Sequence, residues 1–168
     1  MNISIRKWKI EDAEELSKAI NNKNILNNLR EGIPFPYTID NAKEFITQTL
    51  NVKEDSQYSW AIIVDEIVIG SIGAFRKDNI HHLTAEMGYY IAEEYWGKGI
   101  MTKVVKDVSK YIFDNTDIVR IFAEPFACNI ASCKVLEKAG FELEGILRKN
   151  AIKNNKILDM KMYSIIKY

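Results

Sequence analysis

The chain has 168 residues, of which 47% are hydrophobic and 27% charged, and its 23 basic and 23 acidic residues give a formal net charge of zero. This length and apolar content predict a single domain over residues 1–168, and the balanced charge argues against bulk attraction to nucleic acid. Because no apolar run of about 18 residues occurs and Met1–Arg6 has neither a charged leader nor an apolar core, we expect a cytoplasmic soluble protein without membrane contact.

Hydrophobic patterning and turn residues predict an alternation of strands and helices. In chain order we expect a strand at 3–7, helices at 11–20, 23–30 and 40–50, strands at 58–65, 67–76 and 83–92, a helix at 98–114, a strand at 117–124, a helix at 130–139, and strands at 141–150 and 157–167. A tight turn at Asp65–Glu66 joins the first pair of hairpin strands. Crossover helices combined with antiparallel hairpins predict a three-layer α/β fold, in which helices flank a mixed, mostly antiparallel sheet of about seven strands.

Three of the expected helices carry an apolar stripe. The stripes are Ala42, Phe45, Ile46 and Leu50 in the third helix, Met101, Val104, Val105, Val108, Tyr111 and Ile112 in the helix at 98–114, and Ala131, Val135, Leu136 and Ala139 in the helix at 130–139. In the helix at 98–114, four charged residues lie on the expected solvent side: Lys103, Lys106, Asp107 and Lys110.

The segment Tyr95–Thr102 is the most informative part of the sequence. It lies between a strand-like run, Thr84–Ile91, and the helix that follows. Gly97 and Gly99 allow positive φ and leave the backbone uncovered, while free N–H groups and the helix dipole favour an anion there. The segment matches neither a Walker A loop nor the Rossmann fingerprint. We therefore expect this turn to hold the pyrophosphate of a large cofactor, the alternative being glycines used only for turn geometry.

A second motif runs from Asn129 to Phe141 after the apolar strand at 118–124. Asn129 is a natural N-cap and Gly140 lies where a C-cap glycine belongs. The motif is either a capped connecting helix or a helix that presents Asn129 and Ser132 at the mouth of a cofactor groove.

The charges are unevenly distributed along the chain. Residues 1–97 contain 10 basic and 15 acidic residues, whereas residues 98–168 contain 13 basic and 8 acidic ones. A basic second half suits a polyanionic cofactor and an acidic first half suits a cationic amine, although a mixture of solvated surface charges would give the same counts.

The cysteines and histidines do not form a metal-binding pattern. Cys128 and Cys133 lack metal-ligand spacing, and His81 and His82 lie in a separate loop. We expect no metal, and we expect both cysteines to be buried structural residues rather than nucleophiles.

Over nearly its whole length the chain resembles the GNAT superfamily of acyl-CoA-dependent N-acetyltransferases. The resemblance rests on Ile5–Asp12, on the run from Ala85 to Gly99, and on Asn129–Phe141. Pro34–Thr38, the strand beginning with Glu86 and the Asn-x-x-Ser motif make it most similar to the ribosomal-protein N-terminal acetyltransferase (Rim-type) branch. The resemblance implies acetyl-CoA as cosubstrate and a central strand pair that splays apart to receive pantetheine. The cofactor-binding residues that it implies are Tyr89, Tyr90, Ile91, Trp96, Gly97, Lys98, Gly99, Ile100, Met101, Thr102, Asn129 and Ser132.

The sequence departs from the family pattern at four positions. Trp96 stands where the pyrophosphate loop usually begins with Gln or Arg, and Met101 replaces its last small residue. Neither change removes a backbone donor. Leu136 stands where many members carry a tyrosine acid, and Ala151 stands where some ribosomal-branch members place a glutamate. The general acid and base therefore have to be sought elsewhere.

Glu86 is the expected catalytic base, acting on the amine through water, and its alternative is a solvent-facing or salt-bridged strand carboxylate. Ser132 either donates to the leaving sulfur or only caps its helix. Phe35 and Tyr37, in a loop stiffened by prolines, are expected to contact the acceptor, although they would also serve to cover the core edge.

The expected acceptor is a primary amine, most simply a ribosomal-protein-type N-terminus, and the expected assembly is a monomer or homodimer. Two alternatives stay open. The first is a small-molecule N-acetyltransferase that acts on a polyamine or an aminoglycoside. The second is a CoA-binding sensor without turnover.

Overall fold

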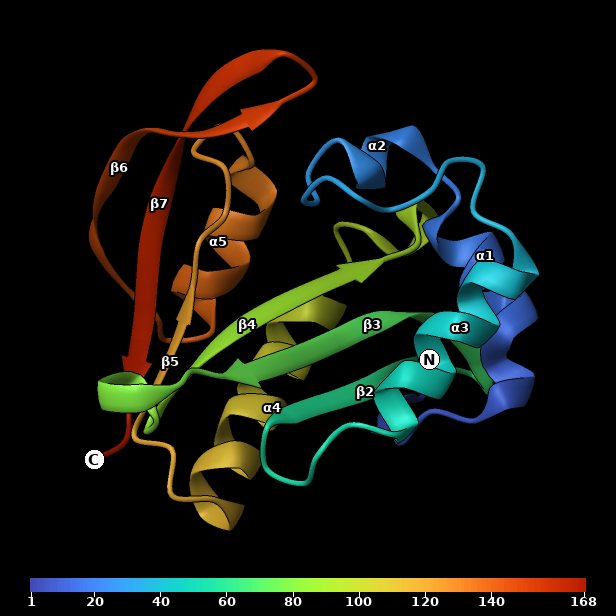
Figure 1. The fold of residues 1–168 in the computed structure, drawn as a ribbon, viewed down its shortest axis with the longest axis horizontal. Helices are drawn as coiled ribbons and strands as arrows, with labels where there is room; N and C mark the ends of the chain where they lie inside the picture. The colour runs from blue at the N-terminus through green and yellow to red at the C-terminus, as the bar shows by residue number, and fades with distance from the viewer. The chain divides into compact units, whose positions relative to one another are not determined.

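The computed structural model describes residues 1–168 and contains seven strands and five α-helices (Figure 1). The strands are β1 (Ile3–Arg6), β2 (Gln57–Val64), β3 (Ile67–Arg76), β4 (Thr84–Ile91), β5 (Arg120–Ala123), β6 (Glu142–Lys153) and β7 (Lys156–Ile166). The helices are α1 (Ala13–Ile20), α2 (Lys23–Leu26), α3 (Ile39–Leu50), α4 (Ile100–Asn115) and α5 (Ile130–Lys138), with single 3-10 turns η1 (Ile10–Asp12), η2 (Asn79–His81) and η3 (Glu93–Tyr95). None of these helices is long and apolar enough to cross a membrane.

The strands form one sheet in the order β1-β2-β3-β4-β5-β7-β6. The sheet is mostly antiparallel and contains one parallel pair, β4 with β5, whose register runs from Thr84 opposite Arg120 to Glu86 opposite Phe122. The predicted fold class, an α/β fold with about seven strands and flanking helices, is confirmed. The splay of β4 from β5 beyond Glu86 stays a prediction.

Backbone contacts divide the chain into two compact units. One unit comprises Met1–Gly73 and Gly88–Ile100, and the other comprises Ala74–Met87 and Met101–Tyr168. Both cuts fall inside regular elements, β3, β4 and the first turn of α4. That residues 1–168 form a single domain stays a prediction.

The first unit is built on a core of apolar side chains from β2, β3 and α1 to α3, joined by Trp8 and Tyr37 from loops. Its buried members include Trp8, Leu16, Ile20, Ile25, Tyr37, Ala42, Ile46, Ala61, Ile63 and Val68. Trp8 packs edge-on against Phe45 with ring centroids 5.6 Å apart, and its indole N–H donates to Ser59 Oγ at 3.0 Å. The buried ring thus keeps its polar atom satisfied. Leu50, expected in the α3 stripe, is 53% exposed because it is the last helical residue, one turn beyond buried Ile46.

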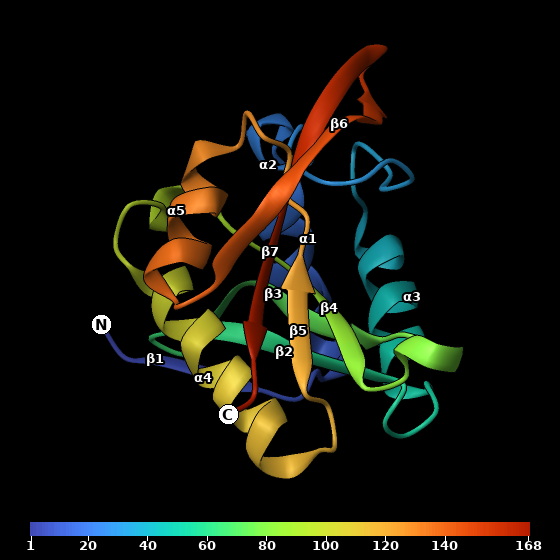
Figure 2. The ribbon, with the colours of Figure 1, turned by 90° about the vertical axis from the view of Figure 1, so that its left-hand side faces the viewer.

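The second unit contains a long hairpin of β6 and β7 beside β5, with α4 and α5 (Figures 1 and 2). The predicted stripe of α4 is buried at Met101, Val104, Val105, Val108 and Ile112. Tyr111 was wrongly placed in it: this residue is 49% exposed, since it lies at the edge of the stripe, about 100° around the helix from Ile112. In α5, Ala131 is exposed because it lies about 160° around the helix from Cys133, which is buried instead.

Several predicted boundaries differ from the structure by two or more residues, among them the start of α1 and the end of β6. Helix α4 begins at Ile100 rather than at residue 98, because Gly99 has φ +75° and cannot be helical. Helix α2 ends at Leu26, after which single 3-10 hydrogen bonds carry the chain to Leu29. Strand β5 spans only Arg120–Ala123. The predicted tight turn between β2 and β3 is confirmed, with Asp65 at φ 47° and Glu66 at φ 73°, the left-handed pair of a two-residue hairpin turn.

Candidate active site

The segment between β4 and α4 is a glycine turn with an uncovered backbone. Gly97 and Gly99 have φ of +72° and +75°, as the sequence predicts. A Cβ atom added at either glycine would meet no heavy atom within 4 Å. The missing side chains therefore leave open space over the turn, and the 16-residue helix α4 starts directly after it with free backbone N–H groups. This geometry suits the approach of a phosphate group.

The shape of the turn is fixed by contacts within the first unit. The Trp96 indole N–H donates to the carbonyl of Ile91 at 2.9 Å, and the N–H of Ala92 donates to the carbonyl of Ile69 at 2.7 Å. The Lys98 ammonium lies over the Tyr95 ring, 5.2 Å from its centroid. Trp96, which stands where the family usually has Gln or Arg, is thus a structural anchor that ties the turn back to the end of β4.

A carboxylate also joins the turn to α2. Asn22 Nδ2 donates to Glu93 Oε2 at 2.5 Å, and Asn24 Nδ2 donates to Glu93 Oε1 at 3.0 Å. The side chain of Asn22 caps α2 at the same time by accepting from the N–H of Asn24. Sequence reasoning missed this contact, because the partners are 71 and 69 residues apart in the chain.

The residues at the end of β4 lie close against β3. A Cβ at Gly70 would stand 2.2 Å from the Tyr90 carbonyl oxygen, so only glycine permits this approach. Ile91 is buried, while Tyr89 and Tyr90 are partly buried. Burial is the main cause that raises the pKa of Tyr90 far above its ordinary range, and the nearby Tyr37 adds a smaller effect in the same direction. The Tyr90 phenol therefore stays protonated. The expected pairing of pantetheine with the backbone of Tyr89 to Ile91 stays a prediction.

Glu86 lies in an ordered cluster of charged side chains in the second unit. Its carboxylate is 3.3 Å from the Lys77 ammonium, and only 15% of its side chain is exposed. Lys77 also lies over the ring of Phe122, 5.6 Å from the centroid, and Phe122 is the cross-strand partner of Glu86. The structure thus shows the salt-bridged alternative for this carboxylate. A catalytic role for Glu86 stays a prediction.

A second ion pair lies against the same Phe122 ring. The Arg120 guanidinium lies 5.8 Å from the ring centroid and binds Glu144 through two hydrogen bonds, at 2.8 and 2.5 Å. The hydrogen bonds from Arg120 lower the pKa of Glu144, and the same contact raises the pKa of Arg120. Both groups are therefore charged at neutral pH.

Helix α5 has the predicted caps. Asn129 Oδ1 accepts from the N–H of Ser132 at 3.2 Å, which confirms the N-cap. Gly140 has φ +97°, its N–H donates to Glu137, and the N–H of Phe141 donates to Leu136, which is a Schellman C-terminus. The helix is thus well fixed at both ends. Roles of Asn129 and Ser132 toward a cofactor stay predictions.

The two cysteines differ. Cys133 is buried and adjoins Tyr163, whose hydroxyl donates to Glu137 at 2.8 Å. Cys128 is exposed, so the expectation of burial was wrong for this residue: it lies in the loop before Asn129 rather than on the inward face of α5. No group of three His, Cys, Asp or Glu side chains is arranged to hold a metal ion.

Phe35 and Tyr37 are placed differently in the first unit. Phe35 is 50% exposed, with the Lys23 ammonium 5.4 Å from its ring centroid. Tyr37 is 8% exposed within the core, and burial raises its pKa. Only the Phe35 ring therefore offers much surface to a ligand, and Tyr37 covers the core, as the alternative reading held.

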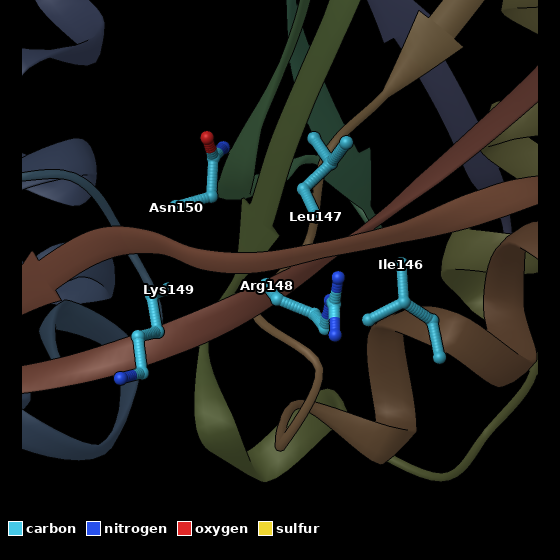
Figure 3. Close-up of a pocket in the computed structure, with 5 residues that line it drawn as sticks. All are labelled: Ile146, Leu147, Arg148, Lys149 and Asn150. Carbon is cyan, nitrogen blue, oxygen red and sulfur yellow. The ribbon is translucent and has the colours of Figure 1, made fainter.

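A shallow hollow follows the irregular middle of β6, where the register with β7 shifts between Leu147 and Ala151 (Figure 3). It is lined by Ile146 to Asn150, and Lys149 has φ +52° with its N–H donating to Asp159 at 2.8 Å. None of the predicted site residues lines this hollow.

Comparison with known proteins places the chain in a family. Residues 2–142 match the model of the Acetyltransferase (GNAT) domain. The probable N-acetyltransferase YjcK of Bacillus subtilis is 35% identical over 133 residues, which cover 77% of this chain and 74% of that protein.

Solved structures share the fold. The ribosomal-protein-S5-alanine acetyltransferase from Vibrio fischeri has a TM-score of 0.88 at 24% identity, covering 99% of this chain and 93% of that one. The spermidine N-acetyltransferase from Vibrio cholerae, in complex with CoA and spermine, has a TM-score of 0.81 at 22% identity, covering 98% and 95%. At these identities the two structures support the fold and do not decide between their acceptors. From the match over residues 2–142 and the relative at 35% identity, the chain belongs to the GNAT acetyltransferase family and is an acetyl-CoA-dependent N-acetyltransferase.

Proposed function

We propose that this protein transfers the acetyl group of acetyl-CoA to the α-amino group at the N-terminus of a protein or peptide. In this proposal the turn from Trp96 to Thr102 binds the pyrophosphate, and Glu86 accepts the proton of the attacking amine through a water molecule. The observation that carries the cofactor half is the open backbone at Gly97 and Gly99, where side chains would fill the space that a phosphate needs.

The pyrophosphate role rests on the donors that the turn supplies. The first N–H groups of an α-helix have no partner within the helix, and the dipole of α4 adds partial positive charge at the same end. Lys98 contributes a full positive charge from between the two glycines. Neither Trp96 nor Met101, the two departures from the family pattern, removes a backbone N–H. The residues present therefore fit a diphosphate.

The chemical step then needs a base and a proton donor. The amine nitrogen attacks the thioester carbonyl carbon, the C–N bond forms, and the C–S bond breaks to release the thiolate. Glu86 takes the proton that the amine loses, and the thiolate regains a proton on leaving. Leu136 has no proton to give, so we assign this donation to the hydroxyl of Ser132.

The choice of an α-amine follows from acid–base chemistry. The reference pKa of an α-amine is about 7.7–8.0, against about 10.4 for lysine. At pH 7.5 about a third of α-amines are neutral, but only about one lysine-type amine in a thousand. A carboxylate that is already ion-paired with Lys77 suffices to deprotonate an α-amine and is poorly suited to deprotonate a lysine-type amine. Phe35 keeps its expected role as an acceptor contact in this proposal, since this residue is 50% exposed.

An acceptor panel tests this proposal. Thiol release from acetyl-CoA is measured with a lysine-free peptide that has a free N-terminus, an N-terminally blocked peptide that retains one lysine, spermidine and an aminoglycoside. The proposal predicts turnover with the first peptide and at least tenfold slower turnover with the others, because their amines are less often neutral at the assay pH. Faster turnover of spermidine or the aminoglycoside would contradict the assignment. CoA binding without turnover of any acceptor would favour a sensor.

A further inference from the structure

The carboxylate of Glu86 is covered by a cation of the protein itself. The Lys77 ammonium lies 3.3 Å from Glu86 Oε1, and the Lys77 side chain is 43% exposed while that of Glu86 is 15% exposed. Lys77 is therefore the outer member of the pair. An amine that delivers its proton to Glu86 arrives next to this ammonium group.

The backbone around Lys77 is fixed. Its N–H donates to the carbonyl of Thr84 at 2.9 Å, so Lys77 is paired with the start of β4. The preceding residue, Arg76, binds Asp117 and the carbonyl of His82, both at 2.7 Å. These contacts fix the backbone from which the Lys77 side chain reaches Glu86.

A second fixed cation lies near the first. The Arg120 guanidinium and the Lys77 ammonium lie 5.8 Å and 5.6 Å from the centroid of the same Phe122 ring. Arg120 donates two hydrogen bonds to Glu144, and Arg120 lies opposite Thr84 in the parallel pair of β4 and β5, two residues before the position opposite Glu86. The cluster around Phe122 thus contains two cations and two carboxylates.

We propose that Lys77 is a specificity-determining residue that selects acceptors with a single positive charge and rejects polycationic amines. The inference rests on the proposed role of Glu86 as base. A peptide N-terminus brings one charge to this carboxylate. A polyamine brings further ammonium groups along a short chain, and these are repelled by Lys77.

Lys77 is the member of the cluster on which this discrimination depends. Arg120 donates two hydrogen bonds to the carboxylate of Glu144, which offsets its charge. Lys77 forms an ion pair of 3.3 Å with Glu86 and also lies over the Phe122 ring, and we propose that it gives up the ion pair when the ammonium of an acceptor takes that place. Its charge is then unmatched at the moment when a second ammonium group would approach.

The test compares two substitutions with a control. Lys77→Met keeps the approximate length of the side chain and removes the charge, whereas Lys77→Arg keeps the charge. The control Lys110→Met removes an exposed lysine of α4 that pairs with Asp114. For each variant kcat and KM are measured with spermidine and with a lysine-free peptide. We expect Lys77→Met to raise the ratio of kcat/KM for spermidine to that for the peptide by about tenfold, mainly through a lower KM for spermidine. Lys77→Arg and Lys110→Met should keep the wild-type ratio.

The inference is overturned if Lys77→Met leaves the ratio of the two kcat/KM values unchanged. This includes an equal fall of kcat/KM with both acceptors, which would give Lys77 only a supporting role for Glu86. Calorimetry of spermidine binding to the CoA-loaded protein requires no turnover, and unchanged binding in Lys77→Met also overturns it. The wild-type preference between spermidine and peptide tests the proposed function separately. A wild-type enzyme that prefers spermidine refutes the peptide assignment, whereas a peptide-specific enzyme with an insensitive Lys77 refutes this inference alone.

Discussion

Replacing Gly99 by alanine separates the folding role of the glycine turn from its role in binding. Gly99 has φ +75°, a conformation that costs a residue with a Cβ atom about 1–2 kcal/mol. No heavy atom lies within 4 Å of the added Cβ, so packing adds no further cost. In a chain of this length the strain lowers Tm by about 2–8 °C. The variant is therefore expected to fold.

Binding should suffer more than folding, because the new methyl group occupies the space that a phosphate needs over the turn. We expect CoA affinity to fall at least about tenfold, equivalent to about 1.4 kcal/mol. Calorimetric titration with CoA measures this loss, and scanning calorimetry measures the change in Tm. Gly145→Ala is the matched control, since Gly145 in β6 also has open space around it but no left-handed φ.

The control should keep both Tm and CoA affinity. A folded Gly99→Ala protein with wild-type CoA affinity would refute the placement of the pyrophosphate. An equal loss of affinity in Gly145→Ala would show that the effect does not come from the turn.

Three further predictions concern the base, the support of the turn and stability. Glu86→Gln should lower kcat about 100-fold and leave CoA affinity unchanged, as measured by steady-state kinetics and calorimetry; a rate within about twofold of wild type would return Glu86 to a structural role. Glu93→Ala removes both hydrogen bonds that Glu93 accepts from Asn22 and Asn24 and should weaken CoA binding about threefold. Its control is Glu94→Ala, which changes an exposed neighbouring residue and should leave CoA affinity unchanged. Equal affinities of the two variants in calorimetry would show that the contacts of Glu93 do not support the turn. Burial alone would raise the pKa of Asp12, but hydrogen bonds from Arg6 at 2.7 and 2.8 Å and from a backbone N–H lower it overall. A carboxyl group with a lowered pKa stabilises the folded state near neutral pH, and this contribution is lost as the pH falls below about 4 through the folded-state pKa. The free energy of unfolding measured with urea should therefore fall in this range in the wild type, and should fall less in Asp12→Asn.

The parts of the fold that depend on local pattern are readable in the sequence. The stripe of α4, the glycine turn and both caps of α5 each follow from residues within one or two turns of each other, and the structure has them where they are expected. The errors are also local. Gly99 was included in α4 although its positive φ ends the helix, and Tyr111 was counted as inward although it lies at the edge of the stripe.

The contacts that define the site chemically are not readable in this way. Lys77 meets Glu86 only because β3 and β4 turn back on each other, and Glu93 meets Asn22 across 71 residues of chain. Tyr37 follows two prolines, a context that suits an exposed loop residue equally well. Its burial is set by neighbours such as Asn21, whose side chain accepts from the N–H of Tyr37 at 3.3 Å. Such partners are chosen by tertiary structure, so a single sequence offers no signal for them.

Mass spectrometry of the acetylated product tests the central claim most directly. The protein is incubated with isotopically labelled acetyl-CoA and a mixture of ribosomal proteins, peptides with free N-termini and spermidine, and fragment spectra then locate the label. The account predicts label on the N-terminal α-amine of a protein or peptide, with lysine side chains and spermidine unlabelled. Label on spermidine with every N-terminus untouched would contradict it.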